Sequence, residues 1–238
     1  MNPRLIFLHL KLPGRTVKAH HSSADIGAMM ELFDYAVLSF ASLFVIVDPV
    51  GLIPAFLAMT QSNTAQERVR MARLAAWVTF AILILSFFFG QRLLQAFGIT
   101  LPAFEIAGGV VLLLVALDML QARRTAVKET QEEKAEAIAK EDVAITPLAM
   151  PMLAGPGAIT AVILLANKSG ALLYRAVLAE NIILVSLFTF LILWFVAVRS
   201  KILSVIALKI MARLMGLLLA AIAIQFILNG LKATGLFG

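Results

Sequence analysis

Long apolar stretches separated by polar segments dominate the hydropathy pattern of this chain. Six of them come close to the ~20 residues that a helix needs to cross the hydrocarbon core of a bilayer. They lie at residues 35–59, 75–97, 101–120, 143–166, 176–198 and 214–231. Their continuous apolar character does not fit the alternating strands of a membrane barrel. The pattern therefore predicts an all-α, polytopic membrane protein with six transmembrane helices.

Proline and glycine interrupt the first and the fourth of these stretches near their middles. The first contains DPVG at 48–51 and the fourth contains GPGA at 155–158. The two prolines coincide when these segments are aligned. Since each half of the chain then has three spans, the halves must be inverted relative to each other. We therefore predict two inverted three-helix repeats in which the first helix of each half is broken.

The repeats define the predicted domains. The first repeat covers 33–120 and the second covers 143–238, with a charged linker at 121–142 that alternates acidic and basic residues near helical spacing. This alternation predicts a solvated cytoplasmic helix. Residues 1–32 are predicted to be an N-terminal arm, disordered or derived from a misassigned start. Their apolar piece is too short for the core of a signal peptide.

Composition and charge fit the same class of protein. The chain has 61% hydrophobic and 14% charged residues and no cysteine, which removes disulfide and thiolate chemistry. The net charge of +6 is explained by the positive-inside rule and does not indicate nucleic-acid binding, because twelve Lys and Arg residues lie in the connections on one side of the predicted spans. That side should be cytoplasmic and both termini periplasmic. The other side, beyond the first thirty residues, carries only Arg92, Lys168, Arg175 and Lys232.

The two breaks predict a binding site near the middle of the membrane. A broken helix frees backbone N–H and C=O groups, which cost several kcal/mol each in hydrocarbon unless they are buried in protein or line a wet cavity. One break alone is equally well explained as a proline kink. Two breaks at matched positions of an inverted repeat favour the substrate site of a secondary transporter.

Asp48 is the acidic residue nearest the centre of a predicted span. Asp followed by Pro suits an N-cap and the first helical position, so Asp48 and Pro49 are predicted to start the second half of the broken helix. A capping role alone is the alternative. A functional role is nevertheless favoured, because ionisable residues inside a membrane are costly and are usually retained for function. Glu105, Asp118 and Glu180 lie closer to span ends, where capping or the interface accommodates them.

Four motifs resemble those of the MarC family of six-helix prokaryotic membrane proteins. They are DPVGLIP at 48–54, AFEIAGGVVLLLVALDML at 103–120, PLAMPMLAGPGAIT at 147–160 and RLMGLLLAAIAIQFILNGL at 213–231. The resemblance runs from about residue 33 to 235. It implies a bacterial inner-membrane protein of the neutral amino acid transporter group, with glycine or alanine as the expected substrate. Asn229 and Glu105 depart from the family pattern, which has an acid and a basic residue there.

The break chemistry and the resemblance together define a candidate substrate site. The substrate carboxylate would meet backbone N–H groups of the second break, and its ammonium would meet Asp48 and freed carbonyls of the first. Asp48 could also carry a coupling ion, H+ or Na+. The candidate residues are Asp48, Pro49, Gly51, Gly155, Pro156, Gly157, Thr160 and Gln225, the last two as weaker polar lining.

Other functions stay open at this stage. An ion channel or cation exchanger using Asp48, or an exporter of another small solute, would use the same break. An enzyme is not expected, because no predicted span contains histidine and the chain has neither HExxH nor GxSxG. No cofactor, metal or nucleic acid is expected, and the oligomeric state is open. Small residues such as Gly108, Gly109 and Ala223 are predicted to let helices pack closely.

Overall fold

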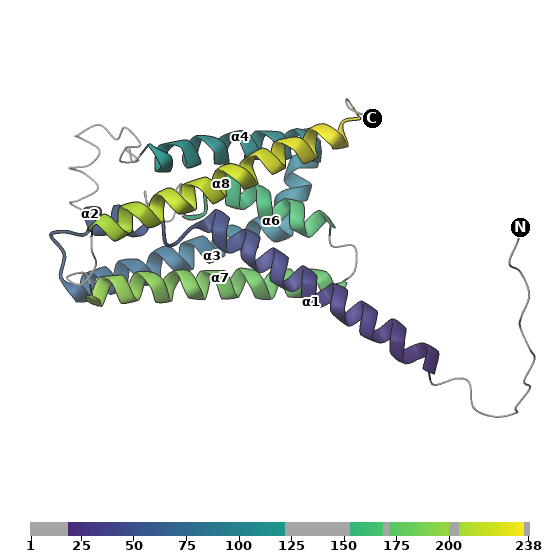
Figure 1. Cartoon of the computed structure of the whole chain (residues 1–238), viewed down its shortest axis with the longest axis horizontal. Coiled ribbons are helices and arrows are strands. Elements are labelled where there is room, and N and C mark those ends of the chain that lie inside the picture. The colour runs from purple at the N-terminus through teal and green to yellow at the C-terminus, as the bar shows by residue number, and fades with distance from the viewer. Residues whose placement is uncertain (1–18, 122–152, 169–171, 200–204, 236–238) are drawn as a thin grey trace, which may run out of the picture. The chain divides into compact units, whose positions relative to one another are not determined.

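The computed structural model describes residues 19–121, 153–168, 172–199 and 205–235, and these residues are helical apart from short connections. Seven helices are described and are labelled as in Figure 1. They are α1 (Ala19–Val47), α2 (Ile53–Met59), α3 (Ala65–Ala96), α4 (Leu101–Leu120), α6 (Pro156–Lys168), α7 (Leu172–Arg199) and α8 (Val205–Ala233).

Within the described residues, five helices are long and apolar enough to cross a membrane. These spans are Met29–Val47, Ala65–Ala96, Leu101–Leu120, Leu172–Arg199 and Ile210–Ala233, and a shorter apolar helix covers Pro156–Asn167. The prediction of an all-α, polytopic membrane protein is therefore confirmed. The predicted fourth span is described only from Leu153 onwards, because its first part, and the linker before it, lie outside the described residues.

The first predicted span has different bounds in the structure. Residues 35–59 do not form one crossing, because α1 ends at Val47 and α2 has only seven residues, a length of about 10 Å. The crossing segment is Met29–Val47. It starts inside the predicted arm 1–32, since α1 begins at Ala19, whereas residues 1–18 lie outside the described part.

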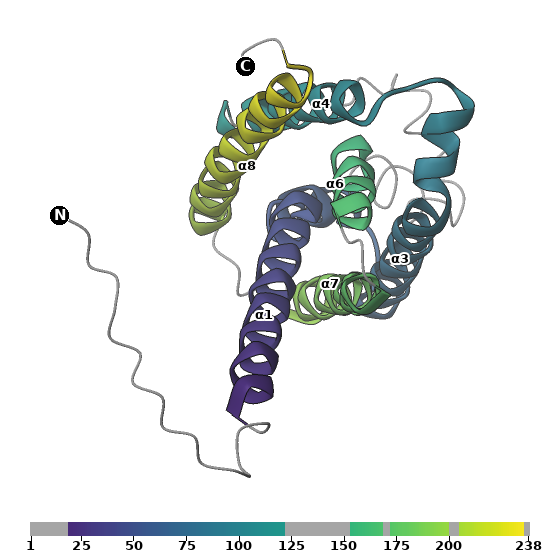
Figure 2. The same ribbon diagram turned by 90° about the vertical axis from the view of Figure 1, so that its right-hand side faces the viewer.

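The chain divides into two compact units, Met1–Tyr35 and Ala36–Gly238. In the second unit α4 packs along α8, and α3 packs along α7. Figures 1 and 2 show both pairs side by side. The short helix α6 contacts both α3 and α4 and so connects the two pairs. The short helix α2 contacts α7 and α8.

Glycines bring α4 and α8 into close contact. A Cβ atom added to Gly109 would lie 2.7 Å from the Ala223 carbonyl oxygen, and one added to Gly230 would lie 2.9 Å from that of Pro102. Neither position therefore has room for a side chain. The packing role predicted for Gly109 and Ala223 is confirmed, and it is the close backbone approach expected where no hydrophobic effect drives helices together.

A buried polar contact joins α7 to the last turns of α1. The Asn181 amide is 5% exposed and donates to the Ala36 carbonyl oxygen at 2.9 Å and to Ser39 Oγ at 2.7 Å. An amide in an apolar interior needs such partners. Asn181 therefore positions the helix that leads into the first break.

A capping box starts α3. Thr64 Oγ1 accepts the Glu67 N–H at 3.3 Å, and Glu67 Oε2 accepts the Thr64 N–H at 2.7 Å. We expect Thr64→Ala to lower the free energy of unfolding by about 1 kcal/mol, and therefore the melting temperature by about 2–4 °C. Thermal unfolding in detergent, followed by circular dichroism, measures this shift. Thr64→Ser should retain most of the stability, and an unchanged melting temperature for Thr64→Ala would show that the cap is unimportant.

Candidate functional site

The first break is a five-residue connection, 48–52, between α1 and α2. The Asp48 N–H completes the last turn of α1 by donating to the Phe44 carbonyl oxygen at 3.0 Å, and the Asp48 carbonyl accepts the Leu52 N–H at 3.2 Å. Asp48 has a φ of 47°. This left-handed region is uncommon for residues other than glycine, and such backbone strain concentrates at functional sites.

The Asp48 carboxylate is buried inside this break. It is 7% exposed, and its Oδ1 accepts the Gly51 N–H at 2.9 Å. A Cβ atom on Gly51 would overlap the same carboxylate, so glycine is the residue that fits beside it. Asp48 therefore caps the single turn that follows it, as an N-cap does. The prediction that it starts the second helix was wrong in register, because α2 begins at Ile53.

The second break precedes α6, and a proline is the first residue of this helix. Pro156 is the first residue of α6, and the Ile159 N–H donates to the Gly155 carbonyl oxygen at 3.1 Å. Proline suits this position because the first N–H groups of a helix have no intrahelical partner. Gly157 and Ala158 follow it and are buried. Their N–H groups belong to the positive end of the α6 dipole.

Both breaks pack against one face of α4. A Cβ atom on Gly157 would overlap the Leu112 side chain, and a Cβ atom on Gly51 would overlap Met119 Cε as well as Asp48. Leu112 and Met119 are seven residues apart, so they lie on the same side of the helix about 10 Å from each other. The two segments, more than a hundred residues apart in sequence, therefore meet the same wall within about two helical turns.

Thr160 of α6 packs against this face of α4, whereas Gln225 of α8 does not. Thr160 is 1% exposed, its Oγ1 donates to the Pro156 carbonyl oxygen at 2.7 Å, and its side chain fills the space beside Gly108. Gln225 is exposed on α8, where its Nε2 donates to Asn229 Oδ1 at 2.7 Å. Seven of the eight predicted residues therefore belong to the breaks or to the first turns of α6. Gln225 belongs to a pair within α8.

Glu105 is a second buried acid, which was not among the candidate site residues predicted from the sequence. It is 6% exposed and therefore as buried as Asp48. Its position three residues before Gly108 puts it on the same face of α4 as Gly108 and Leu112. The sequence placed it near a span end, where water or lipid headgroups would accommodate it. The spacing of 105, 108 and 112 shows that these residues share one helix face, but only the packing of the partner helices shows that this face is buried.

The helices and the two breaks thus define a multi-pass integral membrane protein with an irregular, partly polar interior against α4. The model of the MarC family of integral membrane proteins matches residues 33–234, and the chain belongs to this family. The UPF0056 membrane protein YvbG of Bacillus subtilis is 38% identical over 203 residues, which cover 84% of this chain and 96% of the relative.

Relatives come from other lineages as well. A UPF0056 membrane protein of Methanocaldococcus jannaschii is 36% identical over 198 residues, covering 83% of this chain and 96% of the relative. YhcE of Escherichia coli is 34% identical over 202 residues, covering 84% and 94%. No solved structure matches the chain. The residues that the family model matches, 33–234, include both breaks.

Proposed function

We propose that this protein is a secondary transporter of small neutral amino acids that works by alternating access. The observation that carries the proposal is the meeting of two helix breaks on one face of α4, with the buried acid Asp48 in the first break. Broken helices near mid-membrane supply the polar groups that a transporter needs for its substrate. An ionisable residue inside a membrane is retained where it has such a role.

The packing of corresponding helices supports two inverted repeats, 33–120 and 143–238. The second helix of the first half, α3, packs on α7, which is the second span of the other half, and the third helix α4 packs on α8. The α4–α8 pair is antiparallel, since Gly230 meets Pro102 while Gly216 meets Met119. Antiparallel pairing of corresponding helices is the arrangement that an inverted repeat requires.

A zwitterion of small size fits the chemistry of the two breaks. The substrate carboxylate would accept from the N–H groups of Gly157 and Ala158 at the start of α6, and its ammonium would meet the Asp48 carboxylate. Leu112 contacts the second break and Met119 the first, so a substrate bound by both breaks would lie near these two apolar side chains, which favours a small, neutral side chain. Asp48 would also take part in coupling to H+ or Na+.

The proposed orientation puts the more basic side and the linker 121–142 in the cytoplasm, with both termini in the periplasm and the protein in the inner membrane. Labelling of single introduced cysteines with a membrane-impermeant thiol reagent tests this orientation. The chain has no native cysteine that would also react. Arg199→Cys should react from the cytoplasmic side and Arg92→Cys from the periplasmic side.

Counterflow of labelled alanine tests the function. Proteoliposomes loaded with unlabelled alanine should take up labelled alanine far faster than empty liposomes, and glycine should compete. Exchange accelerated by internal substrate distinguishes a carrier from a channel. If neither alanine, glycine nor serine exchanges, the amino-acid proposal fails and other small solutes are tested in the same assay.

A cation exchanger or channel is the second candidate function. The observation that favours it is the burial of two acids, Asp48 and Glu105, in the same membrane interior. Side-chain carboxylates, together with backbone carbonyl groups that the first break leaves without a helical partner, are suitable ligands for a small cation. Proton or sodium flux that is independent of alanine would support this function instead of amino acid transport.

A further inference from the structure

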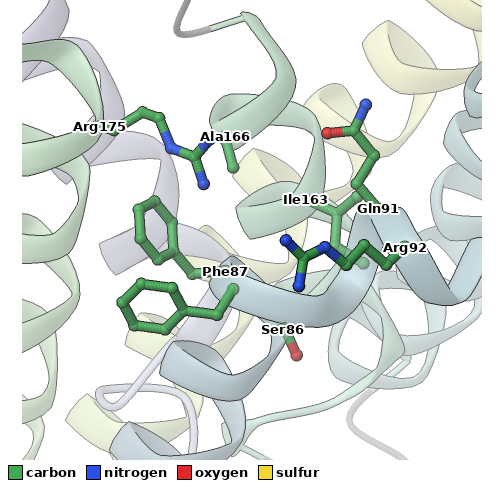
Figure 3. Close-up of a pocket in the computed structure, with 8 residues that line it drawn as sticks. Ser86, Phe87, Gln91, Arg92, Ile163, Ala166 and Arg175 are labelled. Carbon is green, nitrogen blue, oxygen red and sulfur yellow. The ribbon is translucent and has the colours of Figure 1, made fainter. Parts of the chain in front are cut away.

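A small pocket lies where the C-terminal end of α3 meets the start of α7, away from the two helix breaks. It has a volume of about 110 Å³ and is lined by residues of α3, α6 and α7, among them Phe87, Gln91, Arg92, Ile163 and Arg175. Figure 3 shows the guanidinium groups of Arg92 and Arg175 directed into this pocket from two different helices. Two cations thus converge on one small space.

The surroundings hold these cations without neutralising them. The Arg175 guanidinium lies 5.3 Å from the centre of the Phe87 ring, and Gln91 Nε2 donates to Asn167 Oδ1 at 3.3 Å, which links α3 to α6 beside the pocket. Among the described residues neither arginine has a carboxylate partner. Like charges that face each other repel, so an anion between them is favoured.

The position of the pocket indicates where such an anion comes from. Phe88, Leu93 and Leu172 near it are 56%, 58% and 84% exposed, as expected for side chains that face lipid. Arg175 lies in the first turn of α7, whose dipole adds positive potential. The pocket therefore lies at the boundary between the apolar spans and water, where phospholipid headgroups lie. Basic pockets between transmembrane helices bind such headgroups.

We propose that the Arg92–Arg175 pocket binds one phosphate group, presented by the headgroup of a membrane phospholipid. The planar guanidinium groups match phosphate oxygens, and the pocket has room for the phosphate while the acyl chains lie along the exposed apolar residues. Free inorganic phosphate offers the same chemistry and is the other source to be tested. This site is independent of the proposed transport function.

Lipid-dependent stabilisation of the purified full chain tests the site. The protein in neutral detergent is titrated with phosphatidylglycerol, with diacylglycerol of the same acyl chains and with inorganic phosphate at constant ionic strength. The measured quantity is the concentration that gives half of the rise in melting temperature. We expect phosphatidylglycerol to stabilise the wild type and diacylglycerol, which lacks the phosphate, to have no such effect.

Two arginine variants should each raise the half-maximal phosphatidylglycerol concentration about tenfold, the loss expected for one charge-assisted hydrogen bond. These are Arg92→Gln and Arg175→Gln. The matched control is Arg199→Gln, the same charge change at the opposite end of α7. Since Arg175 also contacts Phe87, its replacement can lower the lipid-free melting temperature, and Arg92→Gln then provides the decisive titration.

Each result has a defined meaning. Arginine-dependent stabilisation by phosphatidylglycerol alone supports a lipid headgroup site, and the same dependence with inorganic phosphate supports the oxyanion site with a soluble source. The proposal is overturned if Arg92→Gln and Arg175→Gln respond to phosphatidylglycerol as Arg199→Gln does, or if diacylglycerol stabilises the wild type equally well.

Discussion

Replacing Asp48 by asparagine should reduce alanine counterflow about 100-fold, which corresponds to the 2–5 kcal/mol that removal of one partner of a buried charge pair costs. Asparagine has the size of aspartate, and its Oδ1 can still accept the Gly51 N–H. The break should therefore keep its shape while it loses the charge that attracts the substrate ammonium or a coupling cation. Counterflow in proteoliposomes with matched protein content measures the effect.

Asp118→Asn is the control for this variant. Asp118 is an exposed acid on α4, so the same substitution there should leave exchange unchanged. The melting temperatures of both variants report whether the fold is retained. Wild-type exchange by Asp48→Asn would show that the residue only caps the turn at 49–52. Retained exchange with loss of concentrative uptake would assign Asp48 to the coupling ion instead of the substrate.

The sequence predicted the places where the helices break, because the cause is local. Proline lacks an N–H and disfavours a helical residue before it, and these constraints act whatever surrounds the chain. The predicted break at 155–158 lies where α6 begins, at Pro156, for this reason. The left-handed backbone of Asp48 and the start of α2 at Ile53 were not predictable, since they depend on how the turn fits against Met119.

Burial inside the membrane was predicted less well, because it depends on which helix faces which. Glu105 was predicted to lie near the end of a span, where water or lipid headgroups would solvate it. It is instead buried on the face of α4 that meets α6. Gln225 was placed in the site, yet it is exposed on α8. Both residues lie in uniformly apolar helices, where little amphipathic contrast marks the inner face. Close helix contacts, such as those of Gly108 and Gly109, identify that face only once the partner helices are known.

The contact of both breaks with α4 gives this helix a central role in the proposed mechanism. Because packed protein interiors are hardly compressible, a displacement of one break is transmitted through the shared face of α4 to the other break. Alternating access requires such coupling between the repeats. Leu112 is the residue of α4 that meets the second break, and it is only 4% exposed, so it has little room to move away from a larger neighbour.

Gly157→Ala should therefore destabilise the protein by about 1–3 kcal/mol, the usual effect of overpacking. The added methyl group would overlap the Leu112 side chain. Leu112→Ala removes the obstacle but alone costs about 2–5 kcal/mol, because it leaves a cavity. In a double-mutant cycle the double variant should therefore be less destabilised than the sum of the two single variants, with a coupling energy of at least half of the Gly157→Ala loss. Gly27→Ala is the control, because a Cβ atom there meets nothing within 4 Å.

Alanine counterflow by Gly157→Ala, Leu112→Ala and the double variant separates an effect on packing from an effect on substrate binding. The Gly157 methyl group would point toward Leu112, which leaves the Gly157 N–H available to a substrate carboxylate, so the double variant should also regain exchange. A double variant that is stable but inactive would show that the methyl group blocks the substrate, and hence that the substrate approaches the second break from the α4 side. Equal stability of Gly157→Ala and the wild type would contradict the close packing of α6 on α4 from which the shared wall is argued.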